Sequence, residues 1–284
     1  MCIRDSSGTG VDNTAIGSGA LTDLTTGADN TAVGRVSLAD CTTGSHNTAI
    51  GCESLDVLTT GSHNTGLGKA ALGSLTTASD NTAVGSGSAG GTTTGAYNTA
   101  VGRSALVTNT TGDQNTAVGA NALQASTTAS YNSALGSSAL YANTTGTNNI
   151  AIGRESGQTQ TTANGCTWIG TSSGRVNTAS NNTGVGAGAL YANTTGTQNT
   201  AVGTGVYGST QGALGANTTG DHNTAVGSRS LLLNTTGSSN TAVGDRALQT
   251  NTTASHNTAV GYQALELNTG TENTCLLYTS PSPR

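Results

Sequence analysis

The four histidines of the sequence occupy one recurring position, the residue immediately before an asparagine. They are His46, His63, His222 and His256. Around the first two, the same position holds Asp29 on one side and Asp80 on the other, and imidazole and carboxylate groups are suitable ligands for a transition metal. His46 and His63 are therefore weak candidates for metal ligands. The interpretation that we favour is a solvated polar ladder at a turn, and we predict no cofactor.

Other catalytic patterns are weak or missing. Ser172 lies between two glycines in the pattern of a nucleophile elbow, but such matches arise freely in a chain rich in glycine and serine. The zinc-protease, Cys-x-x-Cys and calcium-loop motifs are absent, and Lys69 lacks the flanking residues of a phosphate-binding loop. We therefore predict that the protein is not an enzyme. We expect Cys41, Cys52 and Cys166 to be free, partly buried thiols.

The composition excludes a conventional core and two classes of partner. Among 284 residues, charged side chains make up 8% and aromatic ones 3%, with one tryptophan and no phenylalanine. Any core must therefore be narrow and built from small residues. The formal net charge of −5 argues against nucleic-acid binding, which requires a basic surface. No apolar run approaches the roughly 18 residues of a membrane span, so we predict no membrane contact in this segment.

Both ends of the chain resemble translated sequencing adapters. Residues 1–6, Met-Cys-Ile-Arg-Asp-Ser, read like one adapter strand, and residues 275–284 resemble its reverse complement with an extension. Segments of this kind are excluded from fold reasoning. We therefore expect the native part of the chain to be residues 7–274, a fragment of a longer protein.

An internal repeat organises residues 7–274. An asparagine recurs in steps of 17 residues at Asn13, Asn30, Asn47, Asn64, Asn81, Asn98, Asn115, Asn132 and Asn149. Later repeats begin at Cys166, Asn182, Asn199, Asn223, Asn240, Asn257 and Asn273. The idealised unit is N-T-A-Φ-G-x-x-A-L-x-x-N-T-T-G-x-x, where Φ is aliphatic, and we count positions from its first residue, the anchor asparagine. A fixed period of this kind indicates a stacked architecture.

The unit predicts one coil of a β-solenoid. Glycine at the fifth position of every complete unit suits a turn with positive φ or a close approach of two backbones, and Asn-Thr-Thr-Gly suits a second turn. Threonine and valine favour strands, whereas the frequent glycines disfavour helix. We predict an all-β fold, a parallel β-solenoid or β-roll of about fifteen coils stacked about 4.8 Å apart.

The repeat also predicts which positions face inward. We expect the aliphatic fourth position and the leucine of the ninth position to form a thin core. The alanines of the third and eighth positions are expected outside, where they leave little bulk. Ladders of asparagine and threonine are expected to hydrogen-bond one coil to the next, as in other stacked sheets.

The run Gly-x-x-Asn-Thr-Ala-Val-Gly-x-x-Ala-Leu resembles the head repeats of trimeric autotransporter adhesins, and similar arrays occur in phage tail-fibre-like proteins. The resemblance covers nearly all of residues 7–274. It implies a left-handed parallel β-roll, a homotrimer with three chains side by side, and a location on the bacterial outer surface or in a virion tail fibre. It also implies attachment to a host surface glycan, protein or matrix receptor. The present unit is longer than the adhesin unit, and the extra residues around Asn-Thr-Thr-Gly enlarge one turn.

Two interruptions of the repeat are candidate recognition sites. In residues 154–181 glycines replace the ninth-position leucine, and Trp168 replaces a small alanine. Trp168 is either a receptor contact or, as we favour, a filler of the space left by the missing leucines. Residues 204–216 contain an expansion of the unit, which predicts a loop, and loops on a rigid scaffold commonly carry recognition. The candidate recognition residues of this loop are Tyr207, Ser209, Thr210 and Gln211, and the alternative is a tolerated insertion.

These observations favour a structural and adhesive rod, a segment of an extracellular adhesin or fibre that attaches through a repetitive, non-catalytic surface. One alternative is a phage tail-fibre segment that binds a receptor. Another is binding to ice or crystalline polysaccharide through a flat ladder of threonines. This ladder includes Thr14, Thr31, Thr48 and Thr65. Because these threonines alternate with alanines that we expect outside, they would point inward, which weakens that alternative. A hexapeptide-repeat acyltransferase is disfavoured because each unit contains a single matching hexad.

Overall fold

Short parallel strands are the regular elements of the computed structural model, which describes residues 9–205 and 211–277. The strands are β1 (Thr14–Ile16), β2 (Thr31–Val33), β3 (Thr48–Ile50), β4 (Thr65–Leu67), β5 (Thr82–Val84), β6 (Thr99–Val101), β7 (Thr116–Val118), β8 (Ser133–Leu135), β9 (Ile150–Ile152), β10 (Thr167–Ile169), β11 (Thr183–Val185), β12 (Thr200–Val202), β13 (Thr224–Val226), β14 (Thr241–Val243), β15 (Thr258–Val260) and β16 (Thr274–Leu276). In the described ranges no helix is long and apolar enough to cross a membrane. The last strand, β16, includes two residues of the segment that we expected to be adapter-like.

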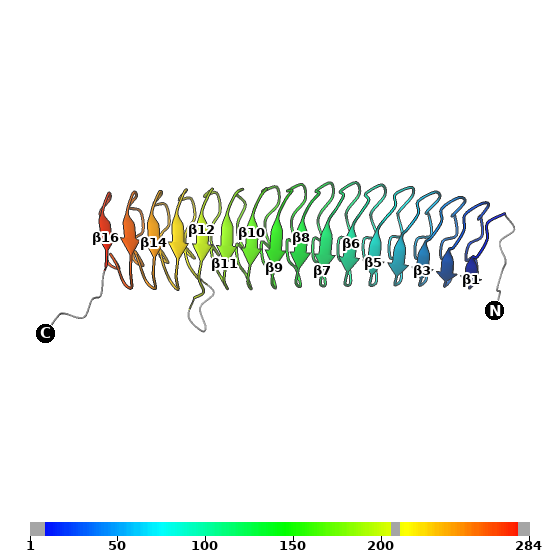
Figure 1. The fold of residues 1–284 in the computed structure, drawn as a ribbon, viewed down its shortest axis with the longest axis horizontal. Coiled ribbons are helices and arrows are strands. Elements are labelled where there is room, and N and C mark those ends of the chain that lie inside the picture. The colour runs from blue at the N-terminus through cyan, green and yellow to red at the C-terminus, as the bar shows by residue number, and fades with distance from the viewer. Residues whose placement is uncertain (1–8, 206–210, 278–284) are drawn as a thin grey trace. The chain divides into compact units, whose positions relative to one another are not determined.

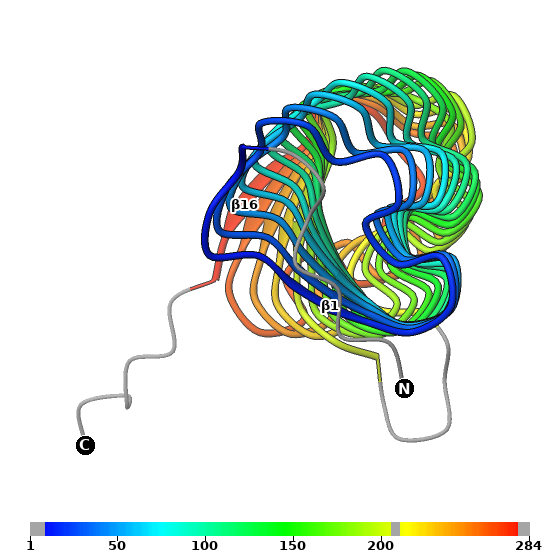
Figure 2. The same cartoon turned by 90° about the vertical axis from the view of Figure 1, so that its right-hand side faces the viewer.

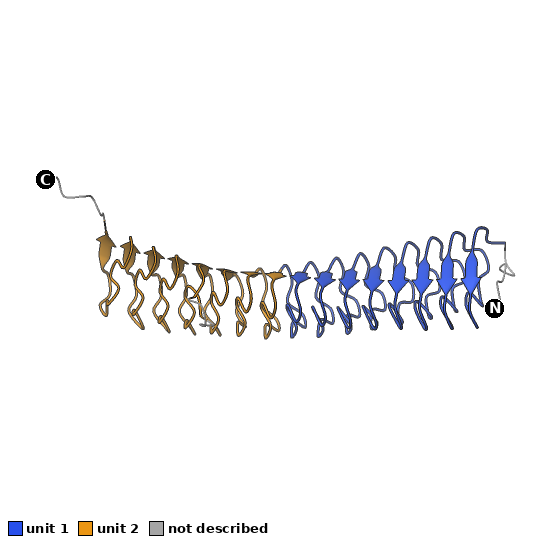
Figure 3. Ribbon diagram, turned by 90° about the horizontal axis from the view of Figure 1, so that it is seen from below, with its two compact units in different colours: residues 1–148 blue, residues 149–284 orange. Residues whose placement is uncertain are grey.

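The chain forms two compact units, residues 1–148 and 149–284 (Figure 3). Strands β1–β8 belong to the first unit and β9–β16 to the second. Within each unit the strands form a parallel sheet in chain order, and one coil of chain leads from each strand to the next (Figure 1). Viewed along the stack, successive coils of a unit follow nearly the same path (Figure 2). The predicted all-β solenoid of about fifteen coils, with a spacing of roughly 17 residues, is confirmed.

The strands pair position by position, so that equal positions of the repeat lie side by side. Thr14 of β1, for example, lies opposite Thr31 of β2. The register is the same across the expansion at residues 204–216, where Thr200 of β12 pairs with Thr224 of β13. Repeats of different length therefore differ in their loops, and the strands keep their alignment.

The interior of the coils is lined by alanine, leucine and asparagine, which corrects part of the expected arrangement. Ala100, at the third position, is fully buried, whereas the threonine and valine on either side of it are half-buried. Ala105 and Leu106, at the eighth and ninth positions, are fully buried as well. The ninth-position core is confirmed, but the third- and eighth-position alanines lie inside and the fourth-position aliphatic side chains lie outside, the reverse of our prediction.

The width of the coil explains this reversal. Side chains alternate along a strand, so a three-residue strand directs only its middle residue inward. There is little space behind that residue. At Gly66, which occupies a third position, an added Cβ would lie 2.5 Å from the Oγ atom of Ser54. Small volume, rather than hydrophobicity, therefore selects the residue that faces inward.

Each 17-residue coil among the described residues bends at four positions with positive φ, the fifth, seventh, ninth and seventeenth. In the coil that begins at Asn98 these are Gly102, Ser104, Leu106 and Gln114. The left-handed conformation costs a leucine about 1–2 kcal/mol. Burial of a leucine side chain contributes about 1.5–3 kcal/mol, which offsets that strain at Leu106. At the fifth position the φ of Gly102 is +133°, and an added Cβ would lie 2.7 Å from the backbone of Gly119, so the expected requirement for glycine is confirmed.

Replacing Gly102 with alanine is expected to lower the free energy of unfolding by about 3 kcal/mol or more, because the strained φ and a backbone clash add together. Gly87→Ala is the matched control. Gly87 also has a positive φ, +64°, but an added Cβ meets no atom within 4 Å, so we expect a loss of about 1–2 kcal/mol. Chemical denaturation followed by circular dichroism compares the two variants, and equal losses would contradict the role assigned to the fifth position.

Candidate functional site

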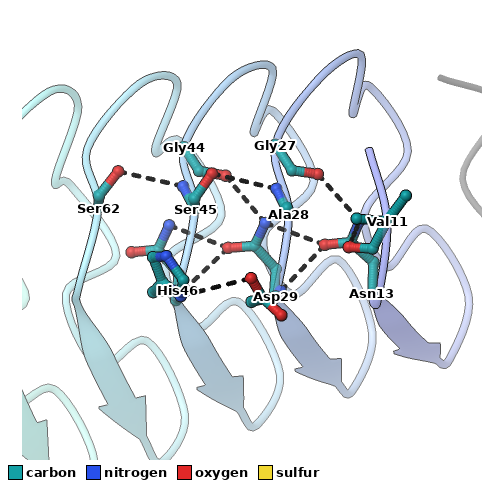
Figure 4. Close-up of polar contacts among 11 residues, drawn as sticks. Val11, Asn13, Gly27, Ala28, Asp29, Gly44, Ser45, His46 and Ser62 are labelled. Carbon is teal, nitrogen blue, oxygen red and sulfur yellow. Dashed lines mark hydrogen bonds and ion pairs between the residues drawn. The ribbon is translucent and has the colours of Figure 1, made fainter. Parts of the chain in front are cut away.

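The anchor asparagines form a buried ladder of side-chain amides at the start of the strands (Figure 4). The Oδ1 atom of Asn13 accepts hydrogen bonds from the backbone N–H and the Nδ2 atom of Asn30, at 3.0 and 3.1 Å. Nδ2 of Asn30 also donates to the carbonyl oxygen of Gly44 at 2.8 Å. Asn47 bonds to Asn30 in the same way, at 2.9 and 3.1 Å. Each of these amides thus ties its coil to the preceding one and closes the turn of its own coil.

Two further ladders use hydroxyl groups of the turn that precedes the strand. At the thirteenth position, Oγ1 of Thr42 donates to the carbonyl oxygen of Thr59 at 3.1 Å. At the sixteenth position, Oγ of Ser45 accepts the backbone N–H of Ala28 at 3.1 Å (Figure 4). The predicted bonding between coils by asparagine and threonine is therefore confirmed. Because these polar groups bond to neighbouring coils, they hold the fold and offer little to a ligand.

His46 and His63 lie side by side, but their geometry does not converge on a metal. Their rings stack with centroids 4.8 Å apart and planes inclined by 10°, and Nδ1 of His46 lies 3.6 Å from a carboxylate oxygen of Asp29 (Figure 4). A ring nitrogen binds a metal in the plane of its ring, so stacked rings direct their lone pairs along nearly parallel planes. In residues 9–205 and 211–277, no group of three His, Cys, Asp or Glu side chains could hold a metal ion. The arrangement agrees with the solvated polar ladder.

Trp168 is fully buried, which contradicts the hypothesis of a receptor contact and agrees with the packing alternative. The ring occupies a third position, inside the coil, and its Nε1 donates to Oε1 of Gln160 at 2.9 Å. An added Cβ on Gly174 would lie 2.3 Å from the ring, and one on Gly184 would lie 2.9 Å from it. Glycines at these two positions therefore provide the space that leucine and alanine fill in other coils.

The expansion at residues 204–216 is described only in part. Tyr207, Ser209 and Thr210 lie outside the described residues. Gln211 is half-buried, and the regular path resumes directly after it, where the N–H of Gly212 donates to the carbonyl oxygen of Gly188 at 2.8 Å. Recognition by this loop stays a prediction.

The outer side of the strands is a regular surface that our sequence reasoning missed. We call the second- and fourth-position side chains of the strands the strand face of each unit. The second position is threonine in most strands, and the fourth is isoleucine, valine or leucine in each. Exposed fourth-position residues include Ile50 at 39%, Leu67 at 42% and Leu135 at 50% in the first unit, and Ile152 at 40% and Val202 at 37% in the second. A hydroxyl row thus runs beside an aliphatic row, each repeating at about 4.8 Å.

Among the described residues, charged side chains are absent from the strand face of both units. The arginines and lysine of this part of the chain lie at the sixth, seventh and tenth positions, beyond the end of the strand. They are Arg35, Lys69, Arg103, Arg154, Arg175, Arg229 and Arg246. A signal for the strand face was present in the sequence. The third position of nearly every repeat is alanine or glycine, whereas the fourth position is isoleucine, valine or leucine.

The cysteines provide a test of the narrow, dry interior. Cys41, Cys52 and Cys166 are free, as expected. Burial raises the pKa of the Cys41 and Cys166 thiols to about 11, so we expect both to resist alkylation near pH 8, where the thiolate is the reactive form. Cys52 is partly exposed, with its Sγ 3.2 Å from the guanidinium of Arg35, and is expected to react. Iodoacetamide labelling of the native protein with peptide mass spectrometry measures this, and equal labelling of Cys41 and Cys52 would contradict it.

The raised pKa values of Cys41 and Cys166 also predict how stability depends on pH. In the unfolded chain these thiols ionise near the ordinary thiol pKa of 9.0, whereas in the folded chain they stay protonated up to about 11. The unfolded chain therefore releases protons first, and the free energy of unfolding is expected to fall as the pH rises from 9 toward 11. Serine variants of Cys41 and Cys166 serve as the control and should lose this dependence.

Comparison of the chain with protein-family models, with curated proteins and with solved structures finds no match. The resemblance carried by the Asn-Thr-Ala-Val-Gly units therefore stays a prediction. The structure itself establishes a β-solenoid repeat protein with a neutral strand face on each unit in the described part of the chain.

Proposed function

We propose that the chain is a structural and adhesive segment of an extracellular adhesin or fibre, on a bacterial outer surface or in a virion tail fibre. In this proposal the strand face packs against further copies of the chain, three in all. The observation that carries the proposal is the row of exposed and half-buried aliphatic side chains along the strand face. The resemblance to trimeric adhesin repeats supports the number of copies and a partner such as a host surface glycan, protein or matrix receptor.

The aliphatic row is a surface that association would stabilise. Contiguous apolar surface on a soluble protein commonly marks an interaction site, and its burial contributes about 25 cal/mol per Å². The second and fourth positions of the described strands are uncharged, so a partner that covers them does not have to strip water from ions. A second copy offers the same spacing between coils, and side-chain contacts can therefore repeat at every coil.

Lysines placed on the strand face are expected to separate the copies. In the 284-residue chain, Ile50→Lys with Leu67→Lys puts two charges on adjacent strands of the aliphatic row. Burying them unpaired would cost several kcal/mol, so the mass from light scattering should fall from three chains to one. Thr43→Lys with Thr60→Lys is the matched control, since these threonines are exposed at the fourteenth position, away from the strands. A well-folded wild-type monomer would overturn the proposal.

A second candidate function is binding to ice or to a crystalline polysaccharide. The outward direction of the second-position threonines favours this function, because threonines on the outside can contact a surface. The sequence had led us to expect these side chains inside the coil. Thr14 is exposed, and Thr31, Thr48 and Thr65 are half-buried on the strand face. An uncharged row of hydroxyl groups spaced by about 4.8 Å can match a periodic surface. A strand face that another copy covers cannot also contact ice or a crystalline polysaccharide. Association and surface binding therefore exclude each other on this face.

Thermal hysteresis tests the second candidate directly. If the wild-type chain is monomeric and binds ice, it should separate the freezing and melting points, and Thr48→Lys with Thr65→Lys should abolish the gap. Thr43→Lys with Thr60→Lys should leave it unchanged, because those residues lie on the turn. A wild-type monomer without thermal hysteresis excludes ice binding.

A further inference from the structure

Two exposed tyrosines occupy the same position of the repeat in coils two steps apart. Tyr97 and Tyr131 each precede an anchor asparagine, and Gln114 fills this seventeenth position in the coil between them. Their side chains are 60% and 55% exposed. The backbone N–H of Gln114 donates to the carbonyl oxygen of Ala96 at 3.0 Å, and that of Tyr131 donates to the carbonyl oxygen of Asp113 at 3.1 Å. These bonds stack the three turns at strand spacing, which places the two tyrosine backbones about 10 Å apart.

The conformation of these tyrosines is costly and gains nothing from the core. Their φ angles are +58° and +62°, in the left-handed region that aspartate, asparagine and histidine tolerate better than bulky residues do. Most other coils use such residues here, among them Asp12, Asp29, His46, His63, Asp80 and Asn148, whereas others use Gln114, Gln198 or Ser239. Burial offsets the strain of the same conformation at Leu106, but Tyr97 and Tyr131 are in solvent. Strain that the fold does not offset is a pointer to function.

The surroundings of the two rings are polar, and their charges are acidic, since Asp113 lies between them and Asp80 occupies the position of Tyr97 in the preceding coil. Exposed Thr111 and Thr128 occupy the fourteenth position, three residues before the seventeenth in the repeat, and no lysine or arginine occurs among residues 104–135. Asp113 is the single carboxylate between the tyrosines in the sequence, and its Oδ1 already accepts the N–H of Ala96 at 2.7 Å. An acidic ligand would find no cation among these residues. A neutral ligand with apolar faces and hydroxyl edges fits the two rings and the exposed threonine hydroxyl groups of the same turns.

We propose that Tyr97 and Tyr131 form a stacking site for a neutral, extended β-1,4-linked glycan chain that runs along the coils. In such a chain every second sugar presents the same face, and this disaccharide repeat is close to the two-coil separation of about 10 Å. The amphipathic tyrosine ring can stack on the C–H face of a sugar while its hydroxyl group bonds to water or to the sugar. Equal φ angles direct the two Cβ atoms the same way. The inference gives the attachment function proposed above a partner class, and rests on it only for its biological setting.

Calorimetric titration of the 284-residue chain with cellohexaose and, in a separate arm, with chitohexaose tests the site and identifies the sugar. We expect one or both to bind, and Tyr97→Ala or Tyr131→Ala to weaken binding about tenfold. The double substitution Gln114→Tyr with Tyr131→Gln keeps two tyrosines but moves them to adjacent coils, and should weaken binding as much. Tyr141→Ala, at an exposed tenth position, is the control and should bind like the wild type.

Three results would overturn the site: no binding of either sugar by the folded wild type, unchanged binding after loss of Tyr97 or Tyr131, or full binding by the variant with adjacent tyrosines. Circular dichroism establishes that each variant is folded. Light scattering reports separately on association through the strand face. Failure of the glycan site and failure of the proposed assembly are therefore distinguishable.

Discussion

The buried amide ladder of the anchor asparagines is the interaction on which the rest of the structure depends. A buried amide without partners costs about 1–3 kcal/mol, and most of these amides find partners on a neighbouring coil in register and in their own turn. A slip by one residue would bring threonine inside and leave the asparagines unpaired. The expansion at residues 204–216 illustrates this constraint, because the N–H of Asn223 still donates to Oδ1 of Asn199 at 2.9 Å. The loops can therefore vary in length, whereas the alignment of the strand starts stays fixed by the ladder.

The period, the turns and the leucine core were predictable from the sequence, because each depends on a residue type that few other residues can replace. Glycine at the fifth position implied an unusual φ, and asparagine every 17 residues implied a ladder. The direction of the strand side chains was not predictable from hydrophobicity alone, since a Thr-Ala-Val strand contains apolar residues on both of its sides. The space available behind Gly66 and Ala100 decides it. That decision turns the most hydrophobic residue of the strand outward and creates the strand face.

The sequence predicted the positions of individual side chains better than their orientation or packing. Repeat spacing correctly placed His46 beside His63, but the stacking of their rings depends on side-chain torsions that spacing does not specify. The loss of leucine at Gly174 marked the coil of Trp168 as irregular, yet the sequence left a receptor contact and a filled interior open. Volume resolves the choice, because the third position faces inward in that coil as in the others, and Gly174 and Gly184 make it wide enough for an indole ring.

The positions on either side of the anchor asparagine lie on the outside of the coil under different constraints. The second position belongs to a strand, so its neighbours on adjacent coils are fixed, and it is threonine from β2 to β7. The seventeenth position must only adopt positive φ, and its side chain takes no part in the amide ladder. Aspartate, histidine, tyrosine, glutamine and asparagine accordingly alternate there between Asp29 and Asn148. A solenoid of this kind can therefore change what it presents at the turn, coil by coil, while the strand face and the ladder beneath it stay constant.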